Sequence, residues 1–211
     1  MTRVAIHRRS LLGATLLAFA GLPLSAAAVD AAAVVAPIQQ LYDGLLAIMH
    51  AGRSVPFAQR FDQLAPAVEN AFDLETVLQV SVGPFWETLP PDQKSMLHAA
   101  FRRYTIASYV NSFDNYNGQR FEVSPQVREL PNAAQEVNTR IIPRSSDPHS
   151  LDYVMRQERQ GWRAVDVLLD GTISRVAVQR SDFRRLLNNG GAEALAKSLL
   201  EKTADLSAGS N

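Results

Sequence analysis

The first half of the chain repeats apolar residues at the three- and four-residue spacing of amphipathic helices. Residues 31–51 show this spacing first, and it returns over residues 55–69, 73–83 and 90–111. Because an α-helix turns once in about 3.6 residues, the spacing brings the apolar side chains onto one face. The apolar face of the first segment consists of Val34, Ile38, Leu41, Leu45 and Ile48. We therefore expect four helices in this half, with Asp73 capping the start of the third and Gly83 ending it.

The second half of the chain changes to a period of two, which is typical of β-strands. Alternating apolar and polar residues occupy segments at 121–130, 137–142, 151–158 and 162–169. Short turn sequences separate these segments, such as the glycine at position 161. Because strands joined by short turns pair antiparallel, the segments predict a meander.

Helical spacing returns over residues 181–189 and 191–203, so helices both precede and follow the strands. Gly190 and Gly191 lie between the two segments and are expected to end the first helix. This order predicts an α+β fold, in which several helices cover one face of a curved antiparallel sheet of about four strands.

Residues 1–28 have the composition of an export signal. Three arginines supply positive charge within the first nine positions, an apolar run follows at residues 11–24, and Ala26-x-Ala28 predicts cleavage after Ala28. The ordinary secretory route is expected ahead of the twin-arginine route, which the adjacent arginines also fit. One domain is expected at residues 29–205, with a disordered tail at 206–211. No other apolar stretch is expected to be long enough to span a bilayer, so the mature protein is predicted to be soluble.

The net charge of the chain changes once the predicted signal is removed. The sequence holds 21 basic and 21 acidic residues, but three of the basic ones precede residue 10 and no acidic one precedes Asp30. The mature chain therefore has 18 basic and 21 acidic side chains, a net charge of −3. Nucleic-acid binders need a concentrated basic face, so no nucleic-acid partner is expected. The absence of cysteine excludes disulfides, thiolate nucleophiles and thiolate zinc sites.

Few residues form a pattern with catalytic or metal-binding chemistry. The three histidines outside the signal each lack a second histidine or a carboxylate at ligand spacing, so no metal and no cofactor are expected. Asp152 or Asp166 could serve as a carboxylate base in a pocket lined by the sheet. Their alternation with apolar strand residues favours structural pairing instead, with Arg163 or Arg175 as partner. The protein is therefore not expected to be an enzyme.

An ordered set of short motifs runs along residues 35–200. The motifs are Phe61-Asp62-x-Leu64, Phe72-Asp73-Leu74, Gly83-x-x-Trp86, Leu89-x-x-x-Gln93, Phe101, Tyr109, Tyr116-x-Gly118, Asp152-Tyr153, Gly161-Trp162-x-x-x-Asp166, Asp170-Gly171, Arg180-x-x-Phe183 and Gly191-x-x-x-Leu195. No single motif is specific, but the set in this order is hard to obtain by chance. It resembles the toluene-tolerance or MlaC family of periplasmic phospholipid-binding proteins, and within that family the hopanoid-biosynthesis-associated HpnM branch.

The resemblance implies an NTF2-like half-barrel that holds lipid acyl chains in a pocket between sheet and helices. It also implies a soluble periplasmic carrier of phospholipid or hopanoid. Such a carrier would receive lipid from an outer-membrane lipoprotein and pass it to an inner-membrane complex of an MCE-domain protein, a permease and an ATPase. Two departures from the family pattern, the longer Gly171–Ser174 segment and Gln179 in place of an aromatic residue, lie near the last helices.

Nine residues of the predicted helices and strands are the expected lipid-binding wall. They are Phe101, Tyr104, Val110, Val137, Ile141, Tyr153, Met155, Val165 and Val167. A pocket wall and a packed core use the same residue types, so periodicity does not separate the two.

Two other functions stay open on the sequence. A small-molecule enzyme on a half-barrel sheet, such as an isomerase or a dehydratase, would place a buried carboxylate beside a tyrosine in a closed polar pocket. A periplasmic adaptor that binds only proteins would have a fully packed interior. The pairs Arg102-Arg103 and Arg184-Arg185 could contact anionic head groups, or simply form solvated helix faces.

Overall fold

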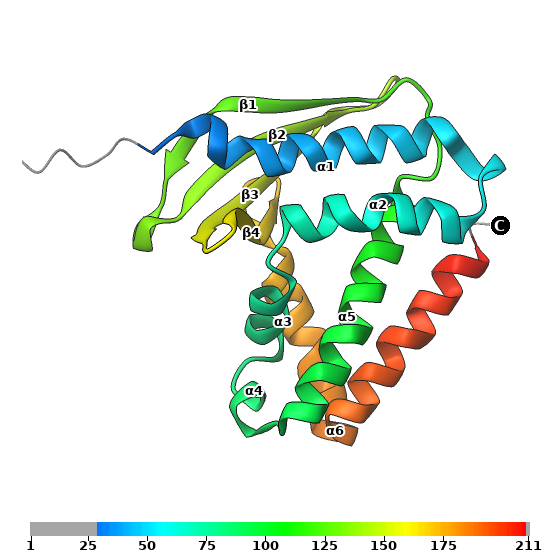
Figure 1. Cartoon of the computed structure of the whole chain (residues 1–211), viewed down its shortest axis with the longest axis vertical. Coiled ribbons are helices and arrows are strands. Elements are labelled where there is room, and N and C mark those ends of the chain that lie inside the picture. The colour runs from blue at the N-terminus through cyan, green and yellow to red at the C-terminus, as the bar shows by residue number, and fades with distance from the viewer. Residues whose placement is uncertain (1–28, 210–211) are drawn as a thin grey trace, which may run out of the picture.

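The computed structural model describes residues 29–209, so the expected export signal at 1–28 lies outside the described residues. Helices come first, a sheet follows, and a long helix ends this part of the chain (Figure 1). The helices are α1 (Ala31–Ala51), α2 (Phe57–Ala71), α3 (Leu74–Val82), α4 (Phe85–Thr88), α5 (Pro91–Ser112) and α6 (Arg175–Ala208). The strands are β1 (Arg120–Glu129), β2 (Gln135–Ile142), β3 (His149–Glu158), β4 (Gly161–Leu169) and β5 (Ile173–Ser174).

The strands form one antiparallel sheet in the order β1-β2-β3-β4-β5, which confirms the predicted α+β meander. The fifth strand was not predicted, because a segment of two residues has no alternation to read. The register shifts between Val123 and Val127 in β1 and between Val154 and Met155 in β3. Bulges of this kind bend a strand and increase its twist, so they account for the curvature of the sheet.

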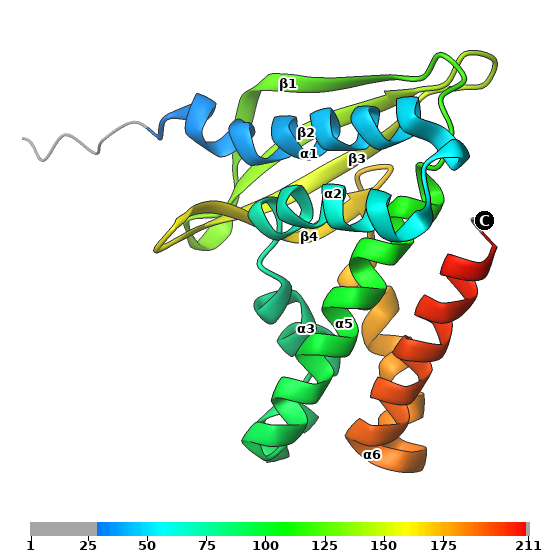
Figure 2. The same ribbon diagram turned by 45° about the vertical axis from the view of Figure 1, so that its right-hand side comes forward.

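The helices cover one side of the sheet. α1 and α2 lie alongside each other next to the strands, and α5 and α6 extend together away from the sheet with α3 beside them (Figures 1 and 2). The two groups of helices leave the end of β4 and the start of α6 close to the middle of α5. This junction is where the candidate site lies.

The apolar face of α1 is the centre of the core, as its sequence predicted. By length and composition, Ala31–Ser54 could cross a membrane, with a mean hydropathy of 1.3. That apolar face is instead covered by the sheet and α2, and its five predicted residues have no exposed surface. Each buried side chain of this size stabilises the fold by about 1.5–3 kcal/mol, so packing within the domain explains the apolar composition.

Local capping residues set the bounds of α3. The Asp73 carboxylate accepts a hydrogen bond from the backbone N–H of Thr76 at 3.0 Å, and Gly83 ends the helix with a φ of 68°. A side-chain acceptor at the start of a helix satisfies one of its free N–H groups, and glycine adopts positive φ without steric cost. The sequence predicted both roles, and the structure confirms them.

The last helix differs from the prediction at both ends. α6 begins at Arg175 rather than residue 181, because the Ser174 hydroxyl accepts a hydrogen bond from the backbone N–H of Ala177 at 3.0 Å and starts the helix there. It continues to Ala208, so the disordered tail expected at 206–211 begins too early, and Leu206 packs against the core. The short helix α4 was also not predicted.

Gly190 and Gly191 interrupt α6, as the sequence predicted. Their backbone angles leave the helical region, with φ −168° and ψ 17° at the first and φ 67° and ψ −160° at the second. α6 therefore consists of two straight pieces that meet at the glycine pair.

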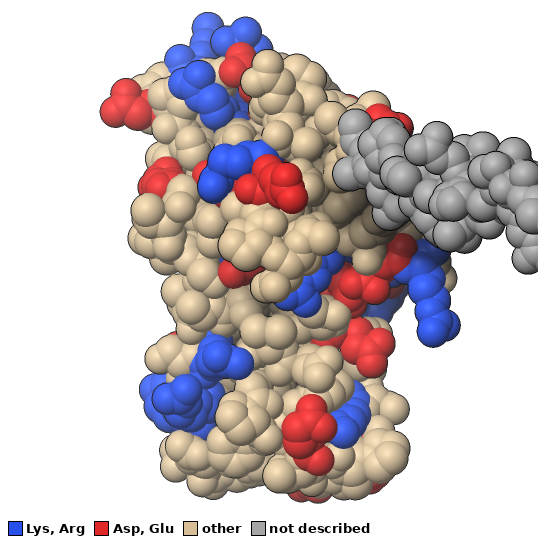
Figure 3. Space-filling model, turned by 90° about the vertical axis from the view of Figure 1, so that its left-hand side faces the viewer, with Lys and Arg blue, Asp and Glu red and all other residues tan. Residues whose placement is uncertain are grey.

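Charged side chains are interspersed over the face of the molecule shown in Figure 3. Basic and acidic groups lie next to each other across most of this face, with uncharged surface between them. Among the ion pairs of the described residues, one joins Arg102 of α5 to Glu69 of α2. Arg102 is therefore part of a contact between two helices, whereas Arg184 and Arg185 are exposed on α6.

Candidate functional site

A cavity of about 320 Å³ lies between the second half of α5, the end of β4 and the start of α6. One side of it is apolar and comes from α3, the sheet, α6 and Phe72, which lies between α2 and α3. The residues of this apolar wall are Phe72, Leu74, Val77, Leu151, Val167, Leu169 and Val176. The cavity therefore lies between sheet and helices, where the resemblance placed a pocket.

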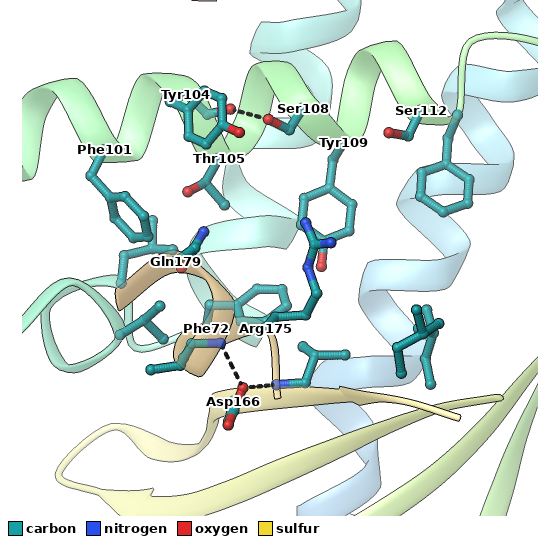
Figure 4. Close-up of a pocket in the computed structure, with 17 residues that line it drawn as sticks. Phe72, Phe101, Tyr104, Thr105, Ser108, Tyr109, Ser112, Asp166, Arg175 and Gln179 are labelled. Atoms are coloured by element: carbon teal, nitrogen blue, oxygen red, sulfur yellow. Dashed lines mark hydrogen bonds between the residues drawn. The ribbon is translucent and has the colours of Figure 1, made fainter. Parts of the chain in front are cut away.

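The opposite wall, on α5, carries a row of hydroxyl groups between the rings of Phe101 and Phe113. Figure 4 shows these side chains along the helix, and they are Tyr104, Thr105, Ser108, Tyr109 and Ser112. Spacings of three and four residues bring them onto one face of the helix. The Ser108 hydroxyl donates to the Tyr104 carbonyl at 2.7 Å, whereas the buried Thr105 Oγ1 has no hydrogen-bond partner within residues 29–209.

Asp166 joins the end of β4 to the start of α6 at the rim of the cavity. One of its carboxylate oxygens accepts from the backbone N–H groups of Val167 at 2.7 Å and Val176 at 3.2 Å. The other accepts from the Ser174 hydroxyl at 2.5 Å. Both oxygens are therefore occupied by donors of its own chain.

Arg175 is the one basic residue among the described residues that line the cavity. It is exposed, and its guanidinium extends from the start of α6 toward Tyr109 (Figure 4). No carboxylate lies within ion-pair distance of it in the part of the chain that the structure describes. The expected pairing of Asp166 or Asp152 with Arg175 or Arg163 is therefore wrong. The Asp166 carboxylate instead accepts hydrogen bonds from backbone N–H groups and the Ser174 hydroxyl. The Asp152 carboxylate accepts one from the side-chain amide of Asn138 at 3.0 Å.

A chain of hydroxyl groups lies behind the cavity wall. The Thr139 hydroxyl donates to the Leu151 carbonyl at 2.6 Å, so it accepts from the Tyr42 hydroxyl, also at 2.6 Å. The Tyr153 hydroxyl donates to that of Tyr42 at 3.2 Å. Each hydroxyl has one proton to donate, so these contacts fix a single direction of donation.

Burial raises the pKa of three tyrosines here, Tyr42, Tyr109 and Tyr153, because a phenolate would lose its hydration. The hydrogen bond with Thr139 partly opposes this increase in the pKa of Tyr42, and the positive charge of Arg175 partly opposes it in the pKa of Tyr109. The three hydroxyls are therefore neutral at neutral pH and present polar, uncharged groups.

Three of the nine predicted wall residues, Phe101, Tyr104 and Val167, line this cavity. The other six lie elsewhere: four have no exposed surface and belong to the packed core, and two are on the sheet. The four core residues are Val110, Val137, Tyr153 and Met155, and the other two are Ile141 and Val165. Whether any of the nine contacts lipid stays a prediction.

The geometry explains why two of the predicted wall residues, Val110 and Val165, do not line the cavity. Val110 is nine residues from Phe101, which is about two and a half turns of helix and places it on the opposite face of α5. Val165 is the extra, unpaired residue of a bulge in β4: Met155 pairs with Ala164 and Val154 with Asp166, whereas Val167 pairs with Tyr153. The bulge therefore removes Val165 from the inner row of the sheet, and alternation alone did not show this.

The hydroxyl row and the residues Arg175 and Gln179 were not predicted as parts of the site. A second signal was available, because Thr105 and Ser108 on the predicted helix 90–111, and Ser112 directly after it, recur at helical spacing. Polar residues at that spacing are normally the solvated face of a helix. Here they face an internal cavity, which only the packing of α6 against α5 creates.

A second cleft, of about 530 Å³, lies between α2 and the last turns of α6. Its lining includes Phe57 and Phe61 on α2 and Leu200 on α6. This cleft does not touch the sheet, and exposed Leu200 lies at its edge. The cavity between sheet and helices is therefore the stronger candidate for an enclosed ligand.

The chemistry available at the main cavity is that of binding. No group of three or more His, Cys, Asp or Glu residues that could hold a metal ion occurs among the described residues. The Asp166 carboxylate is held by three donors, so its position is that of a structural link between β4 and α6. An apolar wall facing a row of hydroxyls suits a ligand with apolar and polar parts.

Two comparisons with known proteins agree on the fold. Residues 39–201 match the model of the family described as MlaC protein. The fold is also similar to that of a phospholipid-binding protein from Ralstonia solanacearum, whose structure was solved in complex with a phospholipid. The TM-score is 0.69 at 20% sequence identity, and the match covers 82% of this chain and 98% of that chain.

Proposed function

Since the chain belongs to the MlaC family of periplasmic, non-catalytic lipid-binding proteins, we propose that it is a carrier of phospholipid. The observation that supports this most is the cavity with one apolar and one hydroxyl wall. The bound phospholipid of the similar Ralstonia protein also supports the proposal. The enzyme alternative is set aside because the family is non-catalytic, and the cavity weighs against an adaptor with a fully packed interior.

The energetics of acyl chains require a carrier to enclose them. Exposing a CH₂ group to water costs about 0.8 kcal/mol, so a chain of about 16 carbons costs about 12 kcal/mol. The apolar wall offers the surface that removes this cost. The hydroxyl wall and the rim offer hydrogen bonds to the polar part of the lipid.

The cavity is at the small end of the range of about 300–1,000 Å³ for ligand pockets, so two long acyl chains require its wall to widen. The break at Gly190 and Gly191 separates the half of α6 that lines the cavity from the half that carries buried Leu195 and Leu199. In our proposal the first half of α6 moves outward when lipid enters.

The partners in this proposal are an outer-membrane lipoprotein as donor and an inner-membrane complex of an MCE-domain protein, a permease and an ATPase. The sequence has no glycine-rich phosphate loop, so exchange by this protein itself would be passive. Export would follow the ordinary secretory route.

Hopanoid is a second candidate cargo, and the resemblance of the motifs to the HpnM branch favours it. Lipid extraction from protein purified from periplasm, followed by mass spectrometry, distinguishes the two. Recovery of phospholipid alone would remove the hopanoid alternative, and recovery of hopanoid alone would overturn the choice of phospholipid. Recovery of no lipid under gentle conditions would contradict the carrier proposal.

The substitution Val167→Trp tests the cavity as the site. Val167 lies on the apolar wall, so an indole there fills space that the ligand needs, and recovered lipid should fall about tenfold. Val178→Trp is the matched control, because Val178 is 46% exposed on α6 and does not line the cavity. Equal lipid recovery from both variants, each with an unchanged circular dichroism spectrum, would place the lipid elsewhere.

A further inference from the structure

We infer that the rim of the cavity holds a subsite for the phosphate group of a phospholipid, with the Arg175 guanidinium as its central donor. This inference rests on the proposed function and adds where the polar part of the lipid lies. The evidence is a set of unused donors around the cavity and the way in which its one carboxylate is occupied.

Arg175 lies where it can bind an anion and forms no ion pair within residues 29–209. It lines the cavity, it is exposed at the rim, and no acidic side chain pairs with it in residues 29–209. The one acid that lines the cavity, Asp166, already binds two backbone N–H groups and the Ser174 hydroxyl. A guanidinium presents planar donors that match the oxygens of a phosphate, so an unpaired arginine beside an apolar cavity favours that group.

The first turn of α6 does not itself offer the anion site. The backbone N–H of Val176 donates to Asp166, and that of Ala177 donates to the Ser174 hydroxyl. Side chains must therefore bind the anion. The positive charge of Arg175 acts on the hydroxyl of Tyr109, toward which its guanidinium extends (Figure 4), so these two groups face the same part of the rim.

Further inside, a second unused group can donate a hydrogen bond. Thr105 Oγ1 is buried in the cavity wall without a partner among the described residues. The phosphate and the glycerol esters of a phospholipid offer only acceptors. Phosphate at Arg175, with an ester oxygen at Thr105, would pair both of these donors.

The test compares lipids with and without phosphate. Purified protein is incubated with vesicles of equal parts phosphatidylglycerol, phosphatidylcholine and diacylglycerol, separated from them by gel filtration, and its lipid is quantified by mass spectrometry. Arg175→Gln should lower the ratio of phospholipid to diacylglycerol about tenfold, the loss expected for a hydrogen bond to a charged group. Arg175→Lys, which keeps the charge but loses the planar fork, should lower it less. Arg185→Gln, an exposed arginine of the same helix outside the cavity, should leave it unchanged.

The outcomes separate the subsite from the proposed function. If wild-type protein retains no lipid, the carrier proposal fails and the subsite fails with it. If lipid is retained but Arg175→Gln leaves the ratio unchanged, the subsite is wrong and the carrier proposal stands. Phosphorus NMR with inorganic phosphate alone gives the last comparison. Arg175-dependent binding of free phosphate would overturn the assignment to a lipid head group, and no binding agrees with it.

Discussion

At the scale of single residues, Tyr42 is the central member of the buried hydroxyl chain. Its hydroxyl donates to Thr139 and accepts from Tyr153, while its ring stacks on Phe121 with centroids 4.6 Å apart. The Tyr153 hydroxyl also has two hydrogen-bond partners, the hydroxyls of Tyr42 and Tyr109. Both tyrosines are buried, so each hydroxyl depends on these contacts for its hydrogen bonds.

The substitutions Tyr42→Phe and Tyr153→Phe should therefore have similar costs. Each keeps the ring but removes the partner of two buried hydroxyls, and each should lower the free energy of unfolding by about 1–3 kcal/mol. Urea denaturation of both variants measures the two values. A loss below about 0.5 kcal/mol in either variant would contradict the role of its hydroxyl in the buried chain.

At the scale of elements, the glycine pair in α6 is a site where backbone conformation at one position and close packing at the other select glycine. Gly191 has φ 67° and ψ −160°, a combination that side chains avoid. A Cβ atom on Gly190 would lie 2.7 Å from the Cβ of Ala194. Both positions therefore disfavour alanine. At Gly191 the backbone angles are strained for any side chain, and at Gly190 a Cβ would lie too close to Ala194.

Gly191→Ala should lower the free energy of unfolding by about 1–3 kcal/mol, because alanine is strained at this φ and ψ. Gly209→Ala is the matched control, since Gly209 has φ −74° and a Cβ there would make an ordinary van der Waals contact, 3.5 Å from the Asp205 carbonyl oxygen. Its effect should stay within about 0.5 kcal/mol. Thermal unfolding of the two variants gives the comparison. A similar loss in both would mean that the break in α6 carries no backbone strain.

The sequence predicted the elements whose signal is periodic over many residues, such as α1 and the meander, and the caps of α3. It did not predict β5 or α4, which are too short to show a period. The candidate site was predicted less well than the fold. Membership of its wall depends on a bulge that shifts Val165 and on which side of α5 meets α6. Contacts between segments distant in the sequence determine the bulge and the packing of α5 on α6, so no local sequence pattern predicts them.

At the scale of the whole molecule, three neutral tyrosines make stability depend on alkaline pH. The pKa of each of Tyr42, Tyr109 and Tyr153 is raised by burial above the ordinary value of 10.0, which we take for the unfolded chain. Above pH 10 the unfolded chain loses these protons first, so the unfolded state binds fewer protons than the folded state. The contribution of the three groups is therefore complete below pH 10 and is lost as the pH rises toward their raised values.

Urea denaturation at a series of pH values from about 8 to 11 should show this loss. The free energy of unfolding should be flat with respect to these groups at first and then fall as the pH passes 10. Tyr42→Phe, which removes one of the three groups, should make the fall less steep. Absorbance of tyrosinate from these three side chains should appear together with unfolding. An unchanged slope in the variant would contradict the link between burial and stability.

The two walls of the cavity come from different parts of the chain, so mutations in one wall and in the other have different effects on the protein. Substitutions in the sheet wall alter the core on which folding depends, since Val167 pairs with buried Tyr153. Exchanges among serine, threonine, alanine and valine on the cavity face of α5 alter the polarity of the wall with little change in volume. Natural selection, or an engineer, could therefore shift cargo preference along one helix face while the rest of the domain keeps its sequence.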